Sequence, residues 1–121
     1  MNNVSIVGKI GRVWNATAET ASIRLACCLL GVQRPYRVSG AYKYDTFMIR
    51  GWGPAAERLL MAVPGQIIGV SGILESDDNN VYINARSIFF YSNKESQEID
   101  EVYKEYDRRP GAVPSSDLPD F

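Results

Sequence analysis

The chain has 121 residues, 45% of them hydrophobic, and a formal net charge of −1. This length suits one domain with a single core, and no stretch approaches the roughly 18 apolar residues that a membrane-spanning helix needs. The chain lacks histidine, the side chain most often used in acid–base catalysis and metal binding, and it opens without a secretory signal pattern. We therefore expect a soluble, cytoplasmic protein that is not an enzyme and holds no metal or other cofactor.

The charge is divided unevenly along the chain. Residues 1–91 carry nine Lys or Arg and six Asp or Glu, a net charge of +3, whereas residues 92–121 carry four and eight, a net charge of −4. The adjacent Cys27 and Cys28 should point to opposite faces of a strand, which suits neither a disulfide nor a metal pair. The pattern predicts a mildly basic domain followed by an acidic tail.

The first half of the domain reads as three strands. Apolar residues alternate from Val4 to Ile10, with a bend expected at the nearby glycines, and a loop is expected over residues 12–20. A second strand is predicted over residues 21–30 and a third over residues 46–52. Residues 31–44 mix turn formers with cations and aromatics, which indicates a hairpin tip or a long loop. The inner face of the second strand is predicted to carry Ile23, Leu25 and Cys27.

The second half contains the only persuasive helix. It is predicted to begin at Pro54, run through residues 55–63 and stop at Pro64-Gly65. Strands follow at residues 66–74 and 81–91, separated by a polar loop. The order predicts an all-β fold, a five-stranded barrel with one short helix between strands three and four, and a disordered acidic C-terminal tail.

Aromatic and cationic side chains suggest a ligand for this barrel. Single strands of nucleic acid are held without strong sequence preference by cations along the phosphates and aromatic faces under the bases. In the third strand, alternation puts Thr46, Met48, Arg50 and Trp52 on one face. Because a buried arginine is rare, that face is expected to be wet. Trp52 is then a stacking platform, unless it packs under a loop.

Other segments extend this predicted binding set. The residues at 31–44 interleave cations with tyrosines, and the fifth strand offers two further candidates on one face; ordinary solvated loop positions are the alternative. For Trp14, plugging one end of the barrel is favoured over the alternative, contact with nucleic acid from the first loop. The predicted DNA-binding residues are Lys9, Arg12, Arg34, Tyr36, Arg37, Tyr42, Lys43, Tyr44, Met48, Arg50, Trp52, Tyr82 and Arg86.

The end of the chain is its most specific short feature. Phe121 closes the sequence, preceded by Asp117, Leu118, Pro119 and Asp120. An apolar terminal residue ringed by negative charge suits a basic pocket on a partner protein. A merely solubilising tail is the alternative.

Three stretches, at residues 3–11, 50–56 and 65–74, together with the chain end, resemble bacterial and phage single-stranded DNA-binding proteins. The resemblance implies an OB-fold over residues 1–91 and a flexible tail over 92–121. It also implies a homotetramer that wraps single-stranded DNA in replication, recombination and repair, in the bacterial nucleoid or in the host cytoplasm of a phage. Trp52 falls on the family's stacking position, whereas Thr46 replaces a frequent stacking aromatic.

The tip resembles the family's Asp-Asp-(Ile/Leu)-Pro-Phe ending, which implies recruitment of replication and repair proteins. Here Asp120 is inserted between Pro119 and Phe121, and the tail lacks the family's usual long linker. A second function remains open, an OB-fold adaptor that scaffolds proteins with weak or no DNA binding. Its support is the low charge of the domain and the threonine at position 46.

Overall fold

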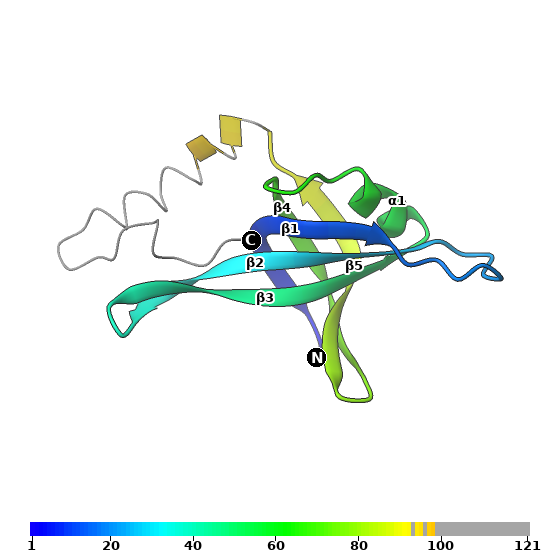
Figure 1. The fold of residues 1–121 in the computed structure, drawn as a ribbon, viewed down its shortest axis with the longest axis horizontal. Coiled ribbons are helices and arrows are strands. Elements are labelled where there is room, and N and C mark those ends of the chain that lie inside the picture. Colours follow the sequence, from blue (N-terminus) through cyan, green and yellow to red (C-terminus); the bar gives the residue numbers. More distant parts are fainter. Residues whose placement is uncertain (93, 96, 99–121) are drawn as a thin grey trace.

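The computed structural model describes residues 1–92, 94, 95, 97 and 98. Five strands form a closed barrel in the order β1-β2-β3-β5-β4, with one short helix between β3 and β4 in the chain (Figure 1). This confirms the predicted all-β barrel and its helix, while the tail predicted over residues 92–121 lies outside the described residues except for 92, 94, 95, 97 and 98. The elements are β1 (Val4–Asn15), β2 (Leu25–Val38), β3 (Ala41–Trp52), α1 (Pro54–Leu60), β4 (Ile67–Asp77) and β5 (Asn80–Phe90).

Aliphatic side chains fill the barrel. Every element contributes, because alternation along each strand turns one set of side chains inward and α1 adds its buried stripe. Burial of each large aliphatic side chain stabilises the fold by roughly 1.5–3 kcal/mol. The largest fully buried side chains of this core are Ile10, Leu30, Ile49, Leu59 and Ile68.

The predicted inner face of β2 is wrong by one residue. Ala26, Cys28 and Leu30 face the core, whereas Ile23 lies before the strand and is 55% exposed. The strand begins only at Leu25, whose backbone nitrogen and oxygen lie 2.9 Å and 3.2 Å from the side-chain hydroxyl of Thr17. This contact closes the preceding loop.

Strand β1 is longer than predicted and changes partner. It pairs with β4 from Val4 to Lys9 and with β2 from Lys9 to Asn15, so the loop expected at 12–20 begins only after Asn15. At this corner a Cβ on Gly8 would lie 2.5 Å from the carbonyl oxygen of Gly31, so only glycine allows the crossing. The predicted bend is confirmed, since the register shifts between Ile10 and Arg12.

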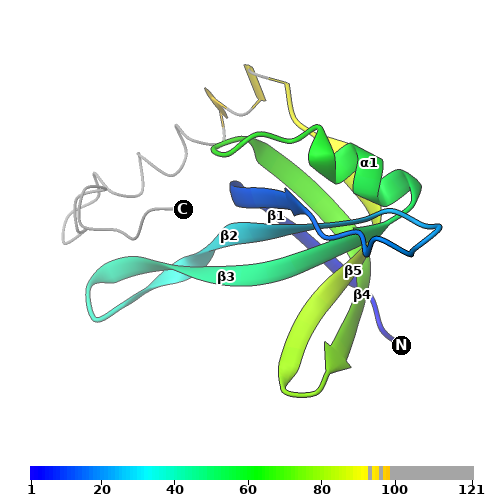
Figure 2. The same cartoon turned by 45° about the vertical axis from the view of Figure 1, so that its right-hand side comes forward.

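Of the two alternatives for residues 31–44, a hairpin tip or a long loop, the structure shows a long β-hairpin. Strand β2 runs to Val38 and β3 begins at Ala41, joined by Ser39 and Gly40 with φ values of 53° and 83°. Two successive positive φ angles match the twist of a tight hairpin turn. Figures 1 and 2 show this hairpin extending well beyond the barrel.

Helix α1 covers one end of the barrel (Figure 2). It begins at Pro54 as predicted but ends at Leu60, three residues before the expected end. Gly51 permits its close approach to β3, since a Cβ there would lie 2.9 Å from the backbone carbon of Ala55. The Arg58 guanidinium donates to the carbonyl oxygen of Ile88 at 2.9 Å and 3.2 Å, which attaches the helix to β5.

The β4–β5 hairpin also projects from the barrel (Figure 2). Its strands extend to Asp77 and from Asn80, so the predicted loop is reduced to a tight turn. Next to it, the Asn2 side chain donates to the carbonyl oxygen of Leu74 and accepts from its amide, both at 2.8 Å. Asn2 thereby imitates one more residue of strand pairing along β4.

Candidate nucleic-acid interface

The outer face of β3 carries the side chains that the sequence grouped together. Met48, Arg50 and Trp52 alternate with the buried Ile49 and Gly51, and the Trp52 side chain is 46% exposed. The indole is therefore accessible from solvent in this single chain. A large exposed aromatic beside an arginine is suited to stacking on a base.

Strand register extends this face across the barrel. Trp14 on β1 pairs with Cys27 on β2, Cys27 with Arg50 on β3, and Arg50 with Asn84 on β5. The assignment of Trp14 to plugging the barrel is wrong, because it lies on this outer row and outside the buried core. The guanidinium carbon of Arg12 lies 4.9 Å from the centroid of the Trp14 ring.

Arg50, Tyr82, Asn84 and Glu75 form a connected cluster on this face. The Arg50 guanidinium carbon lies 3.8 Å from the centroid of the Tyr82 ring. The Tyr82 hydroxyl donates to Oε2 of Glu75 at 2.9 Å, and the Asn84 amide donates to Oε1 at 3.0 Å. Hydrogen bonds from Asn84, which has the larger effect, and from Tyr82 lower the pKa of the Glu75 carboxyl. The hydrogen bond between Tyr82 and Glu75 also raises the pKa of the Tyr82 hydroxyl.

Two cations of the β2–β3 hairpin are held by neighbouring side chains. Arg34 makes a bidentate ion pair with Asp45, with both nitrogen–oxygen distances 2.8 Å. This contact raises the pKa of Arg34 and lowers that of Asp45. The guanidinium of Arg37 lies 5.1 Å from the ring centroid of Tyr42, which is only 6% exposed. Neither arginine projects freely from the hairpin.

The other predicted residues lie on the β2–β3 hairpin, on β1 and on β5. Tyr36 and Lys43 are exposed near the hairpin tip, and Tyr44 is half-buried. Lys9 lies at the corner of β1, and Arg86 is exposed at the register shift of β5. Thr46, also predicted for this face, is exposed on β3 beside Gly31. The predicted protein-interaction tip, residues 117–121, lies outside the described residues.

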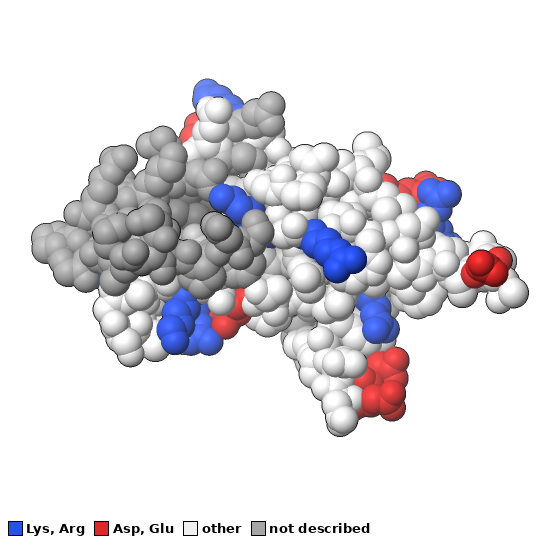
Figure 3. Space-filling model, in the orientation of Figure 1, with Lys and Arg blue, Asp and Glu red and all other residues white. Residues whose placement is uncertain are grey.

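In the view of Figure 3, Lys and Arg side chains are spread over the barrel and the β2–β3 hairpin, with single acidic side chains among them. A larger group of acidic side chains lies on the β4–β5 hairpin. That group would repel a polyanion.

Sequence reasoning missed Glu75 on this face, and it left Trp14 and Asn84 out of the predicted binding set. Alternation within one strand predicts which residues share its face, but only cross-strand register shows which strands lie next to each other. For Trp14, the signal available was the cation two residues earlier, Arg12, at the strand spacing.

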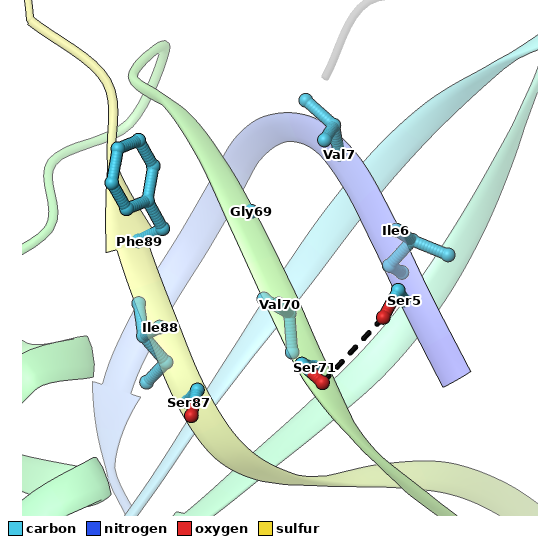
Figure 4. A pocket seen from close by; sticks show the side chains of 9 residues that line it. All are labelled: Ser5, Ile6, Val7, Gly69, Val70, Ser71, Ser87, Ile88 and Phe89. Carbon is cyan, nitrogen blue, oxygen red and sulfur yellow. Dashed lines mark hydrogen bonds between the residues drawn. The ribbon is translucent and has the colours of Figure 1, made fainter. Parts of the chain in front are cut away.

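A second surface of the barrel is apolar. Strands β1, β4 and β5 enclose a shallow groove of about 390 Å³, lined among others by Val7, Gly69 and Phe89 (Figure 4). Phe89 is 58% exposed, and its ring meets that of Tyr91 edge to face at 5.0 Å. Ser5 and Ser71 contribute polar side chains to its lining, with their hydroxyl oxygens 3.5 Å apart.

The described part of the chain contains no group of three or more Cys, Asp or Glu side chains placed to hold a metal ion. Among those residues no helix is long and apolar enough to cross a bilayer.

No family model and no curated protein matches the chain. Solved structures do match its fold. A deletion mutant of the single-stranded DNA binding protein from Thermus aquaticus superposes with a TM-score of 0.65 and 17% identity. That match covers 77% of this chain and 42% of the other, so the chain spans less than half of the Thermus aquaticus protein.

Two shorter proteins match over most of their own length. Protein PriB from Ralstonia solanacearum has a TM-score of 0.61 and 15% identity, covering 76% of this chain and 99% of that one. The second single-stranded DNA binding protein of Mycobacterium smegmatis has a TM-score of 0.59 and 15% identity, covering 74% and 87%. These matches confirm, for the fold, the resemblance to single-stranded DNA-binding proteins.

Proposed function

We propose that this barrel, which has the fold of single-stranded DNA-binding proteins, itself binds single-stranded DNA without strong sequence preference. The bases stack on aromatic side chains and the phosphates contact cations. In this role the protein protects exposed strands and takes part in replication, recombination and repair. It is not an enzyme, and it acts where such strands occur, in a bacterial nucleoid or in the host cytoplasm of a phage.

The observation that carries this proposal is the outer face of β1, β2, β3 and β5. Exposed Trp52 lies two residues from Arg50, and the cross-strand row adds Trp14 with its stacked Arg12. Aromatic rings alternating with guanidinium groups along one surface match the needs of a flexible strand with stackable bases.

Trp52→Ala tests the proposal. Base stacking on one aromatic contributes about 1–3 kcal/mol, so binding of a fluorescein-labelled oligo-dT should weaken about 5- to 150-fold. Met61→Ala is the control, since Met61 is an exposed apolar residue at the end of α1 and belongs to none of the strands that form the face. Fluorescence anisotropy at two salt concentrations measures both affinities, and wild-type binding should weaken as salt rises.

Equal affinities for wild type and Trp52→Ala would contradict the placement of the site. Absence of wild-type binding at low salt would reject the function and leave the adaptor as the candidate. The bidentate contact of Arg34 with Asp45 favours that alternative, since it removes one cation from easy reach of phosphate.

Self-association belongs to the same proposal. The apolar groove of β1, β4 and β5 is suited to a second copy of the chain, because exposed Phe89 and Val7 border it. Residues 4–8 of β1 pair with β4 on one side, whereas the pairing of β1 with β2 begins only at Lys9. Among the described residues, the other backbone edge of residues 4–8 therefore has no partner strand. A backbone edge next to an apolar surface can pair with the same edge of a symmetry-related copy. Two such contacts would build the homotetramer.

The acidic end of the chain would recruit replication and repair proteins. This part of the proposal rests on the sequence Asp117-Leu118-Pro119-Asp120-Phe121 alone. A terminal phenylalanine with its carboxylate supplies one apolar and one anionic contact for a basic pocket.

A further inference from the structure

Glu75 is an unexpected residue on a surface proposed to bind a polyanion. It lies on β4 directly opposite Tyr82, and its carboxylate accepts hydrogen bonds from Tyr82 and Asn84. Those two bonds, assisted by the charges of Arg50 and Arg86, lower the pKa of Glu75. The carboxylate therefore stays ionised near neutral pH and carries a negative charge into the candidate interface.

The contacts of Glu75 lead to Arg50. Tyr82, whose hydroxyl Glu75 orients, carries the Arg50 guanidinium at 3.8 Å from its ring centroid. Asn84, whose amide Glu75 also orients, pairs with Arg50 across β3 and β5. Both immediate neighbours of Arg50 on β5 are thus fixed by one carboxylate.

A guanidinium fixed in this way differs from a freely moving one. A free arginine follows phosphates, whereas one stacked on an aromatic ring presents its planar surface, and bases stack on arginine planes as they do on aromatics. Arg50 and Trp52 are two residues apart on one strand face, a separation of roughly 6.6 Å. That spacing places two flat surfaces side by side for successive bases.

We propose that Glu75 is a positioning residue of the single-stranded DNA site, which orients Tyr82 and Asn84 and thereby holds Arg50 as a base-stacking platform beside Trp52. This role rests on the proposed function. It assigns Arg50 to bases rather than to phosphates, and it gives the acidic residue a favourable part in binding.

Simple electrostatics predicts the opposite sign for Glu75. Removing a negative charge from the face should tighten binding to any polyanion, most of all at low salt. Glu75→Gln removes the charge and keeps the shape, but its single acceptor oxygen cannot serve both donors. The Tyr82 hydroxyl must then turn to accept from the new amide, and the two charge-assisted hydrogen bonds are replaced by weaker neutral ones. The sign of the change therefore separates positioning from charge repulsion.

The experiment compares fluorescein-labelled oligo-dT with an abasic strand of the same length. For Glu75→Gln we expect binding to oligo-dT weakened roughly three- to tenfold and binding to the abasic strand unchanged or tighter. Asp78→Asn is the charge-matched control at the tip of the same hairpin, and it should not weaken either affinity. Thermal unfolding of each variant checks that the barrel is retained.

Tyr82→Phe provides an independent variant that keeps the ring and removes the hydroxyl. It should reproduce the selective loss for oligo-dT, and the double variant should lose no more than Glu75→Gln alone. Three outcomes would each overturn the positioning role. In the first, Glu75→Gln binds oligo-dT as tightly as wild type or more tightly, and in the second it loses equal affinity for both strands. In the third, the losses of Glu75→Gln and Tyr82→Phe add up in the double variant. Wild-type protein that binds neither strand would overturn the proposed function itself, a result distinct from all of these.

Discussion

Cys27 and Cys28 are adjacent, yet their thiols lie in different surroundings. Cys28 faces the core, where burial raises its pKa to about 12. Cys27 lies on the outer row between Trp14 and Arg50; burial raises its pKa too, but the Arg50 charge acts against that effect. Two adjacent residues of one strand thus carry different thiols. The Cys28 thiol is inert in the core, and the Cys27 thiol lies beneath the candidate interface.

This difference predicts an order of alkylation. At pH 8 the native protein should react with iodoacetamide at Cys27 before Cys28, because thiolate is the reactive form and Cys28 is both core-buried and strongly protonated. Mass spectrometry of peptides at successive times measures both rates. In denaturant the two rates should converge, which serves as the control. Faster labelling of Cys28 in the native state would contradict its placement in the core.

At the scale of elements, the sequence predicted the type and order of the strands and the helix better than the residues at which they begin and end. Alternation and turn residues identified five strands and a helix in the right order, because these depend on local pattern. Residues 31–44 were predicted only as a hairpin tip or a long loop. They are strand over most of their length, because β2 and β3 stabilise each other through pairing that their polar residues do not reveal. The face of β3 with Arg50 was predictable from period two alone, whereas its neighbours across β1 and β5 needed the register.

The packing of α1 on β3 makes Gly51 a sensitive position. Gly51→Ala would place a Cβ 2.9 Å from the Ala55 backbone and 3.0 Å from Leu59 Cδ1. Overpacking of this kind costs about 1–3 kcal/mol. Urea unfolding should show that loss for Gly51→Ala.

Gly69→Ala is the matched control for Gly51→Ala. Its nearest neighbours lie at 3.7 Å, an ordinary contact distance. The control should therefore change the free energy of unfolding little. Equal stability of the two variants would show that the helix can shift outward without loss.

At the scale of the whole molecule, β1 and β5 each contribute to two different surfaces. Trp14 of β1 and Tyr82 of β5 belong to the polar, aromatic face, whereas Val7 and Phe89 from the same strands border the apolar groove. The division follows from the corner in β1 and the register shift in β5, which redirect each strand halfway along its length. In the proposed function, the strand binds to one of these surfaces and a second copy to the other.

This division predicts that self-association and DNA binding can be separated. Phe89→Asp puts a charge into the apolar groove, so light scattering after size-exclusion chromatography should show a smaller assembly than wild type. Val81→Asp is the control, since Val81 is equally apolar and exposed but lies on the β4–β5 hairpin outside the groove. A monomeric wild type, or an unchanged mass for Phe89→Asp, would contradict the interface. If the interface is correct, the dissociated variant should still bind a short oligo-dT. Its loss of affinity should be confined to long strands that several subunits contact together, because linked sites raise avidity without changing each contact.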